Sequence, residues 1–304
     1  MINWLRDNRQ TIARAAGSFL AVILLIILLK EESGGEIISA LKRISVWYFL
    51  AAILIMLVSR IFVVGRWHAL LRSAGVDIPF WRTAKLTFTG LFSSNFLPTT
   101  IGGDVVRLAG AMQLGYDRAI CLASMIADRL IGMAGMTVML PFGLIPVLSL
   151  GREGLQQSAL FVMLYKKGID FARRTFDAFK IWLKKPLGLL LSLFSTFGNM
   201  AFIFASIFLL ITGMERHVSY WLIAGMWSLT YFVTLIPISI NGFGVQELSL
   251  TFLLSALGGL DHSESLTIAI LIRLLFVITS LPGAFFLPSI LAEMNKEKPL
   301  ARIA

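Results

Sequence analysis

Apolar residues follow one another in blocks of about twenty along much of this chain, the length that an α-helix needs to cross the hydrocarbon core of a bilayer. Charged residues collect between the blocks. The pattern predicts an all-α polytopic membrane protein with about six full spans. The predicted spans are 15–29, 44–64, 119–150, 155–165, 187–211 and 266–290.

Two further apolar segments are interrupted by clusters of proline and glycine. The first breaks between Pro98 and Gly103, and the second breaks between Pro237 and Gly244. Such clusters end helices, and non-helical backbone at membrane depth is tolerated only inside protein or beside a watery cavity. We therefore expect two re-entrant helical hairpins, at 86–115 and 218–258, within a single transmembrane domain that covers 1–304. Its first half is 1–150 and its second half is 187–290.

Basic residues beside the apolar blocks predict the orientation. Arginine recurs in the first fourteen residues, and lysine and arginine recur after Lys296. Because cytoplasmic loops are enriched in these residues, both termini are predicted in the cytoplasm of an integral cell membrane protein, in the inner or plasma membrane. Lys85 and Arg118 flank the first hairpin, whereas the flanks of the second carry almost no positive charge. The hairpins are therefore expected to open to opposite sides.

Composition excludes a water-soluble globular protein. Only 14% of the residues are charged and 57% are hydrophobic, with a mean hydropathy of +0.83, whereas soluble domains carry roughly a quarter charged residues. The 27 basic and 17 acidic residues give a net charge of +10. In a membrane protein this excess favours contact with anionic lipid, and no nucleic-acid partner is expected.

Residue types that hold metals or catalyse covalent chemistry are sparse. The single cysteine, Cys121, and three scattered histidines exclude a disulfide framework and indicate no metal site. The sequence also lacks the G-x-x-x-x-G-K-[ST] pattern of a P-loop. We expect no cofactor, no ATP hydrolysis by a P-loop and no enzymatic activity of the chain itself.

Residues 166–185 combine apolar positions at helical spacing with seven lysines and arginines. This pattern is typical of an amphipathic helix lying on an anionic leaflet. A linker helix packed on the protein needs the same apolar stripe. The sequence leaves both alternatives open.

The two broken segments resemble each other, and together they predict an inverted repeat. In each, a proline is followed by two glycines and then by a half-helix with a charge in its first turn. Inverted repeats with broken helices are a sequence sign of a transport site, and the amino-terminal ends of half-helices attract anions. The comparison aligns Gly102, Gly103, Asp104 and Arg107 with Gly242, Phe243, Gly244 and Glu247.

Several ionisable residues fall within the apolar segments. For Arg107 and Arg273 we favour a functional role, because an arginine offers paired donors to a phosphate. Asp104 and Glu247 either cap their half-helices or take part in proton coupling or substrate contact. Asp128 and Arg129 are either a buried pair with a neighbour or functional, and Arg60 is expected to extend its charge to the cytoplasmic interface.

Three groups of residues together carry a resemblance to a known family: Asn95–Pro98, Gly102–Asp104 and Arg107; Asp128, Arg129 and Gly132; and Pro237, Ser239, Gly242, Gly244 and Glu247. With these groups the sequence resembles the lysylphosphatidylglycerol synthase transmembrane family, also described as flippase-like proteins. The resemblance spans nearly the whole chain. In one bacterial resistance factor, the flippase part of this family is joined to a soluble synthase domain. In the present sequence, the residues after Ile290 are too few to form such a domain. The resemblance therefore implies lipid translocation without synthase activity.

The sequence thus favours ATP-independent translocation, by a flippase or scramblase, of an anionic membrane lipid of the phospholipid or polyprenyl-phosphate type. Its phosphate is expected between the two half-helix amino termini. The alternatives are a membrane subunit of a lipid-headgroup transferase and a small-solute secondary transporter, and the sequence leaves open whether the chain forms a homo-oligomer. The candidate substrate-binding residues are Asn95, Pro98, Gly102, Gly103, Asp104, Arg107, Asp128, Arg129, Pro237, Ser239, Gly242, Gly244, Glu247 and Arg273.

Overall fold

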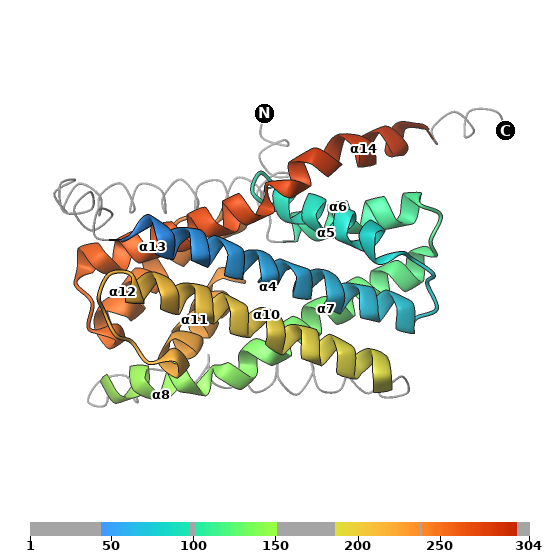
Figure 1. The fold of residues 1–304 in the computed structure, drawn as a ribbon. Helices are drawn as coiled ribbons and strands as arrows, with labels where there is room; N and C mark the ends of the chain where they lie inside the picture. The colour runs from blue at the N-terminus through green and yellow to red at the C-terminus, as the bar shows by residue number, and fades with distance from the viewer. Residues whose placement is uncertain (1–43, 98–100, 151–185, 237–238, 297–304) are drawn as a thin grey trace, which may run out of the picture.

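The computed structural model describes residues 44–97, 101–150, 186–236 and 239–296, and every regular element within these residues is a helix (Figure 1). The predicted all-helical class is confirmed. Four helical segments are long and apolar enough to cross a membrane: Val46–Ser73, Arg118–Met139, Pro186–Thr212 and His262–Pro288. Two predicted spans, 15–29 and 155–165, and the amphipathic segment 166–185 lie outside the described residues.

The first half contains five described helices. They are α4 (Val46–Ser73), α5 (Phe80–Ser94), α6 (Gly102–Gln113), α7 (Arg118–Met139) and α8 (Pro141–Leu150). The prediction that α4 ends at Val64 is wrong, because the helix continues for more than two turns. The predicted span 119–150 is divided just before Pro141, where the missing N–H of proline favours a new helix start.

The second half follows with α10 (Pro186–Thr212), α11 (Tyr220–Thr234), the short 3-10 helix η3 (Ile240–Gly242), α12 (Val245–Gly258), α13 (His262–Ser280) and α14 (Pro282–Lys296). The predicted span 187–211 and the predicted restart at Val245 agree with this. The expected span 266–290 is divided into α13 and α14, again immediately before a proline.

The order of long and short helices is the same in both halves. A long helix is followed by two short helices around a break, another long helix, and a helix that begins with proline. Thus α4 corresponds to α10, α5 to α11, α6 to α12, α7 to α13, and α8 to α14. Packing repeats this correspondence, since α5 packs on α14 in the same way that α11 packs on α8.

The two halves run in opposite directions. Helices α4 and α10 pack along each other (Figure 1), and the Ser59 hydroxyl donates to Asn199 Oδ1 at 3.0 Å. Ser59 and Asn199 stand the same number of residues from the starts of their helices. The flanking contacts are Ser206 Oγ to the Ala52 carbonyl and Ser192 Oγ to the Arg66 carbonyl, each at 3.4 Å. Across these three contacts the residue number increases along α4 and decreases along α10. The two helices are therefore antiparallel, and the repeat is inverted.

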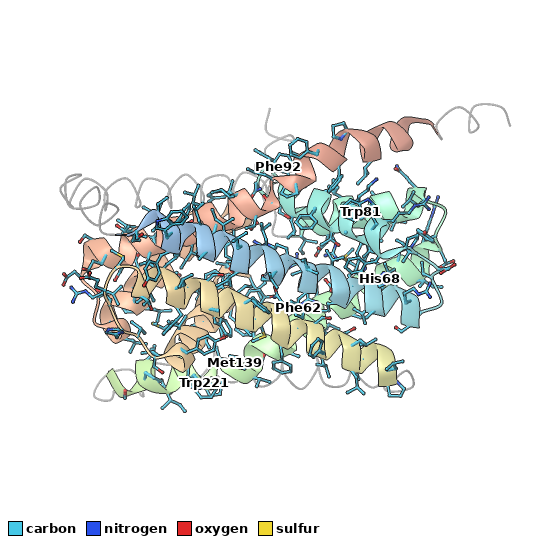
Figure 2. All side chains as sticks on the ribbon, in the orientation of Figure 1. Phe62, His68, Trp81, Phe92, Met139 and Trp221 are labelled. Carbon is cyan, nitrogen blue, oxygen red and sulfur yellow. The ribbon has the colours of Figure 1, made fainter. Side chains whose placement is uncertain are left out.

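The larger apolar core joins α4 and α10 to α11, α12 and α13. Large aromatic side chains such as Trp81 and Trp221 are exposed (Figure 2), as expected for a surface that faces lipid. Polar side chains are therefore concentrated where the helices meet.

Candidate functional site

The amino-terminal end of α6 lies directly against α5. A Cβ atom on Gly103 would clash with the backbone of Gly90 and the hydroxyl of Ser94. Glycine therefore allows the two helices to approach closely, and it brings the first turn of α6 beside the middle of the bundle. This close packing, rather than contact with a ligand alone, accounts for glycine at position 103.

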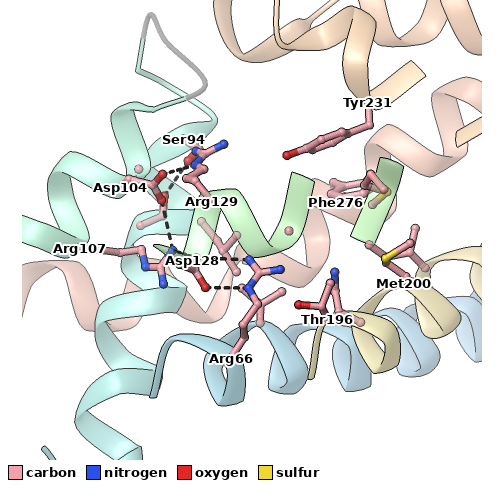
Figure 3. Close-up of a pocket in the computed structure, with 18 of the residues that line it drawn as sticks. Arg66, Ser94, Asp104, Arg107, Asp128, Arg129, Thr196, Met200, Tyr231 and Phe276 are labelled. Carbon is pink, nitrogen blue, oxygen red and sulfur yellow. Dashed lines mark hydrogen bonds and ion pairs between the residues drawn. The ribbon is translucent and has the colours of Figure 1, made fainter. Parts of the chain in front are cut away.

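Five charged side chains from α4, α6 and α7 form one cluster (Figure 3), which we call the charged cluster: Arg66, Asp104, Arg107, Asp128 and Arg129. Arg66 donates to Asp128 through Nε at 2.7 Å and Nη2 at 3.3 Å. Arg107 Nη1 bridges Asp104 and Asp128, at 3.2 and 3.4 Å, and Arg129 Nε donates to Asp104. Asp128 and Arg129 thus each pair with a side chain of a neighbouring helix, which is one of the two alternatives that the sequence left open.

The charged cluster carries an excess of positive charge. Three arginines face two aspartates, which leaves a net charge of about +1 at neutral pH. Arg107 is only 5% exposed, and its Nε and Nη2 are buried without a hydrogen-bond partner among the described residues. Leaving a buried donor unpaired costs roughly 1–3 kcal/mol. The cluster is therefore suited to accept an anion.

The face of Trp67 supports Arg107 from the other side. The guanidinium carbon lies 4.3 Å from the ring centroid, a distance typical of a cation–π contact. The indole N–H of Trp67 donates to Ser124 at 3.2 Å, which holds the ring in place. Arg107 is thus oriented without its two remaining donor atoms being used.

The charged cluster lines a cavity of about 220 Å³. Its opposite wall comes from the second half, where Tyr231 and Phe276 lie away from the Asp104–Arg129 pair (Figure 3). Thr196 and Asn199 of α10 add polar groups, as Ser94 does from α5. The cavity therefore has one strongly polar wall and one aromatic wall.

Arg273 belongs to a second and separate cluster. It pairs with Glu247, donates to the carbonyls of Gly242 at 3.0 Å and Asn241 at 3.4 Å, and lies 4.4 Å from the ring centroid of Phe243. These contacts hold the turn before α12, where Asn241 and Gly242 have positive φ angles of 48° and 71°. Arg273 does not line the cavity, so it stabilises a turn in this structure.

The two acidic residues of the half-helices differ in what they bind. Glu247 accepts the backbone N–H of Gly244 at 2.7 Å, so the capping alternative holds for it. The Asp104 side chain instead accepts from Arg107 and Arg129. The first-turn carboxylate of α6 therefore serves the charged cluster.

Asp104 and Glu247 are nevertheless equivalent in the repeat. Each is the third residue of its half-helix, and their partners Arg129 and Arg273 stand equally far into α7 and α13. The sequence comparison aligned Arg107 with Glu247, whereas the structure makes Asp104 the equivalent of Glu247. The two alignments differ by about one helical turn. The reason is the longer turn before α12, which contains η3 and the positive-φ glycines.

The other candidate residues lie away from the cavity or outside the described residues. The Asn95 amide donates to the Ser280 hydroxyl at 2.8 Å, joining the ends of α5 and α13. Ser239 is buried beside the second turn, and Pro98 and Pro237 lie outside the described residues. The candidates that line the cavity are Gly103, Asp104, Arg107, Asp128 and Arg129; those that do not are Asn95, Gly102, Ser239, Gly242, Gly244, Glu247 and Arg273.

Sequence reasoning missed Arg66, which lies just beyond the end of the predicted span 44–64. The apolar residues after it, Trp67, Ala69, Leu70 and Leu71, are the signal that α4 continues. Ser94, Thr196, Asn199 and Tyr231 were also missed, because single polar residues within apolar helices carry no signal of their own.

The expectation for Arg60 is wrong. Its side chain is not at the interface, because the residue is 4% exposed, donates through Nε to Thr279 Oγ1 at 3.2 Å, and lies 4.6 Å from the ring centroid of Phe276. Arg60 stands near the middle of α4, about 20 Å of helix from either end at 1.5 Å per residue. An arginine side chain is too short to extend to the interface from there.

The family model described as the lysylphosphatidylglycerol synthase TM region matches residues 14–165 and 161–283. A UPF0104 membrane protein of Methanothermobacter thermautotrophicus is 30% identical over 151 residues, which are 49% of this chain and 40% of that relative. The chain thus matches less than half of the length of this relative.

Proposed function

The chain belongs to the lysylphosphatidylglycerol synthase transmembrane family, and we propose that its cavity holds the phosphate of an anionic membrane lipid while the lipid moves between leaflets without ATP hydrolysis. The observation that carries this proposal is the excess positive charge beside the cavity, with two buried and unpartnered donor atoms on Arg107. Arginine is the side chain best suited to phosphate, because its planar donors match two phosphate oxygens.

The size and charge of the cavity limit which ligands can bind in it. A volume of about 220 Å³ is smaller than the roughly 300–1,000 Å³ of pockets that enclose drug-sized ligands. A headgroup phosphate therefore fits while the acyl or prenyl chains stay in the bilayer. A phosphodiester lipid carries one negative charge and would balance the charged cluster. A phosphate monoester of the polyprenyl type carries about −1.5 to −2 and would exceed it.

We also propose that the two broken segments are re-entrant. Helices α5 and α6 have 15 and 12 residues, and α11 and α12 have 15 and 14. At 1.5 Å per residue each is about 18–22 Å long, which is shorter than a hydrocarbon core of about 30 Å. Each pair would enter and leave on one side of the membrane, and we propose that the first pair opens to the cytoplasm.

Cysteine accessibility tests this orientation. Arg118 and His262 begin the equivalent helices α7 and α13, so an inverted repeat places them on opposite sides of the membrane. Single cysteines at these positions, in a Cys121→Ser background, should react with an impermeant thiol reagent from opposite sides. Reaction of both from the same side would contradict the inverted orientation.

Reconstituted vesicles test the transport proposal. The probe is NBD-labelled phosphatidylglycerol in phosphatidylcholine vesicles, and its arrival in the outer leaflet is followed by dithionite quenching. Protein-containing vesicles should exchange the label faster than empty ones without ATP. NBD-labelled glucosylceramide, which lacks a phosphate, should not gain speed. If both lipids exchange equally, the phosphate has no part in the process.

Two further measurements separate the alternatives. Uptake of soluble glycerol phosphate with no lipid exchange would favour a small-solute transporter. Saturable phosphatidylglycerol binding without exchange would favour the membrane subunit of a headgroup transferase. Arg107→Leu is the matched site variant, because it removes the unpartnered donors and leaves two arginines paired with two aspartates. It should weaken phosphatidylglycerol binding about tenfold to a hundredfold, the loss of a charge-assisted contact.

A further inference from the structure

Arg60 lies at the centre of the inverted repeat. The contact between Ser59 and Asn199 joins equivalent positions of α4 and α10, so the pseudo-two-fold axis passes between them. In transporters with inverted repeats this axis lies in the membrane plane. Arg60 is the next residue of α4, which places it at the depth of the bilayer midplane.

Among the described residues, no carboxylate compensates the charge of Arg60. The side chain is 4% exposed, and its one hydrogen bond within the described residues runs from Nε to Thr279. A guanidinium has five N–H donors, so four have no protein partner in this part of the chain. The equivalent position in α10 is Met200, which is apolar.

Arg60 and the cavity are both in contact with Phe276. Phe276 lines the cavity (Figure 3), and the Arg60 guanidinium lies 4.6 Å from the centroid of its ring. Trp227 stacks on the same ring at 5.4 Å. Arg66 of the charged cluster is six residues further along α4, a rise of about 9 Å. Phe276 is thus the side chain that a headgroup would pass between the cavity and Arg60.

We propose that Arg60 is a second binding site for the anionic headgroup, at the membrane midplane, which the headgroup reaches from the cavity by passing Phe276. This inference rests on the proposed function. An anion is least stable in the middle of the bilayer, where water and polar lipid groups are most distant. A fixed positive charge with unused donors at that depth lowers this barrier without adding to binding in the cavity.

The test compares binding with exchange in the same variants. Arg60→Gln should bind phosphatidylglycerol in detergent with an affinity within about twofold of wild type, yet its NBD-phosphatidylglycerol exchange should fall about tenfold or more, the loss of a charge-assisted contact at the barrier. Arg60→Lys should retain part of the rate, because a point charge remains. Wild-type exchange by a folded Arg60→Gln variant would overturn the proposal.

Two controls separate transport from architecture. Thr279→Val removes the hydrogen bond to Arg60 but keeps the charge, so it should keep most of the exchange rate. A loss as large as that of Arg60→Gln would show that Arg60 only joins α4 to α13, and would overturn the proposal. Thermal unfolding should show that Arg60→Met, which keeps the length of the side chain, is no less stable than wild type, since no partner charge is stranded. A large fall in its melting temperature would also contradict a transport role.

The outcomes distinguish this inference from the proposed function. If wild-type protein exchanges phosphatidylglycerol and Arg60→Gln does so equally, only the second site fails. If wild-type protein neither binds nor exchanges it, and Arg107→Leu changes nothing, the cavity site fails as well.

Discussion

The two halves of this protein have the same order of described helices and one equivalent ion pair, yet within the described residues only the first half places further charges beside that pair. Asp104 pairs with Arg129 in the first half as Glu247 pairs with Arg273 in the second. The first half adds Arg66, Arg107 and Asp128. At the equivalent positions the second half has Ser206, Leu250 and Ile272, all of which are buried.

This difference shows how a repeated architecture can separate stability from function. The acid–arginine pair occurs in both halves and positions a half-helix against the following long helix. In the second half two of the three equivalent positions are apolar, and Leu250 and Ile272 join the main core. In the first half the same positions carry charge and border a cavity. We infer that the pair is the structural element and that the three additional charges form the site.

The largest effect is expected for Asp128→Asn. Asp128 is the bidentate partner of Arg66 and also accepts from Arg107, so its loss leaves three arginines with one carboxylate. Breaking a buried ion pair in this way costs about 3–5 kcal/mol. SDS titration in mixed micelles should therefore show a large loss of unfolding free energy.

The matched control is Ile272→Val at the equivalent position of α13. It removes one buried methylene from the core and should cost about 0.5–1.5 kcal/mol. If Asp128→Asn is no more destabilising than Ile272→Val, the charges of the first half do not compensate one another as the geometry indicates.

An intermediate effect is expected for Arg273→Gln. The change removes the partner of Glu247 and the donors to the carbonyls of Asn241 and Gly242. Hydrogen bonds to charged groups contribute about 1.5–3 kcal/mol, so the unfolding free energy should fall by about that amount. The folded fraction should still bind phosphatidylglycerol as wild type does, because Arg273 does not line the cavity.

This variant distinguishes the two arginines that the sequence treats alike. A folded Arg273→Gln protein that has lost phosphatidylglycerol binding would place Arg273 in the site together with Arg107. The halves would then contribute equally, and the asymmetry would not be functional.

Hydrophobic pattern alone predicted most of the helices, because the length and spacing of apolar residues determine which segments can be buried or face lipid. The breaks at Pro98–Gly103 and Pro237–Gly244 were predicted because clusters of proline and glycine end helices, and the start of α12 was placed correctly. Helix α4 was cut short at Val64, because a charge at Arg66 looks like the end of a span until Asp128 is known to neutralise it.

The candidate site was predicted less completely than the fold. Asp104, Arg107, Asp128 and Arg129 were identified, since charges within apolar segments are conspicuous. Which of them meet depends on the packing of α4, α6 and α7, which no local pattern encodes. Arg107 and Arg273 were therefore assigned to one site, although the structure divides them between two clusters.

The smallest effect is expected at the axis that relates the halves. Ser59→Ala removes the donor to Asn199 Oδ1, and a neutral hydrogen bond contributes about 0.5–1.5 kcal/mol. The single variants Ser59→Ala and Asn199→Ala, together with the double variant, form a cycle that isolates this pair from the rest of the α4–α10 contact. A coupling of about 0.5 kcal/mol or more in SDS titration would mean that the equivalent positions meet, as an inverted repeat requires.

Ser206→Ala combined with Asn199→Ala is the control, because Ser206 bonds to the backbone of Ala52 and Phe202 instead. Additive effects of Ser59→Ala and Asn199→Ala would mean that the two halves do not meet at these positions, and Arg60 would then lose its assigned depth at the midplane.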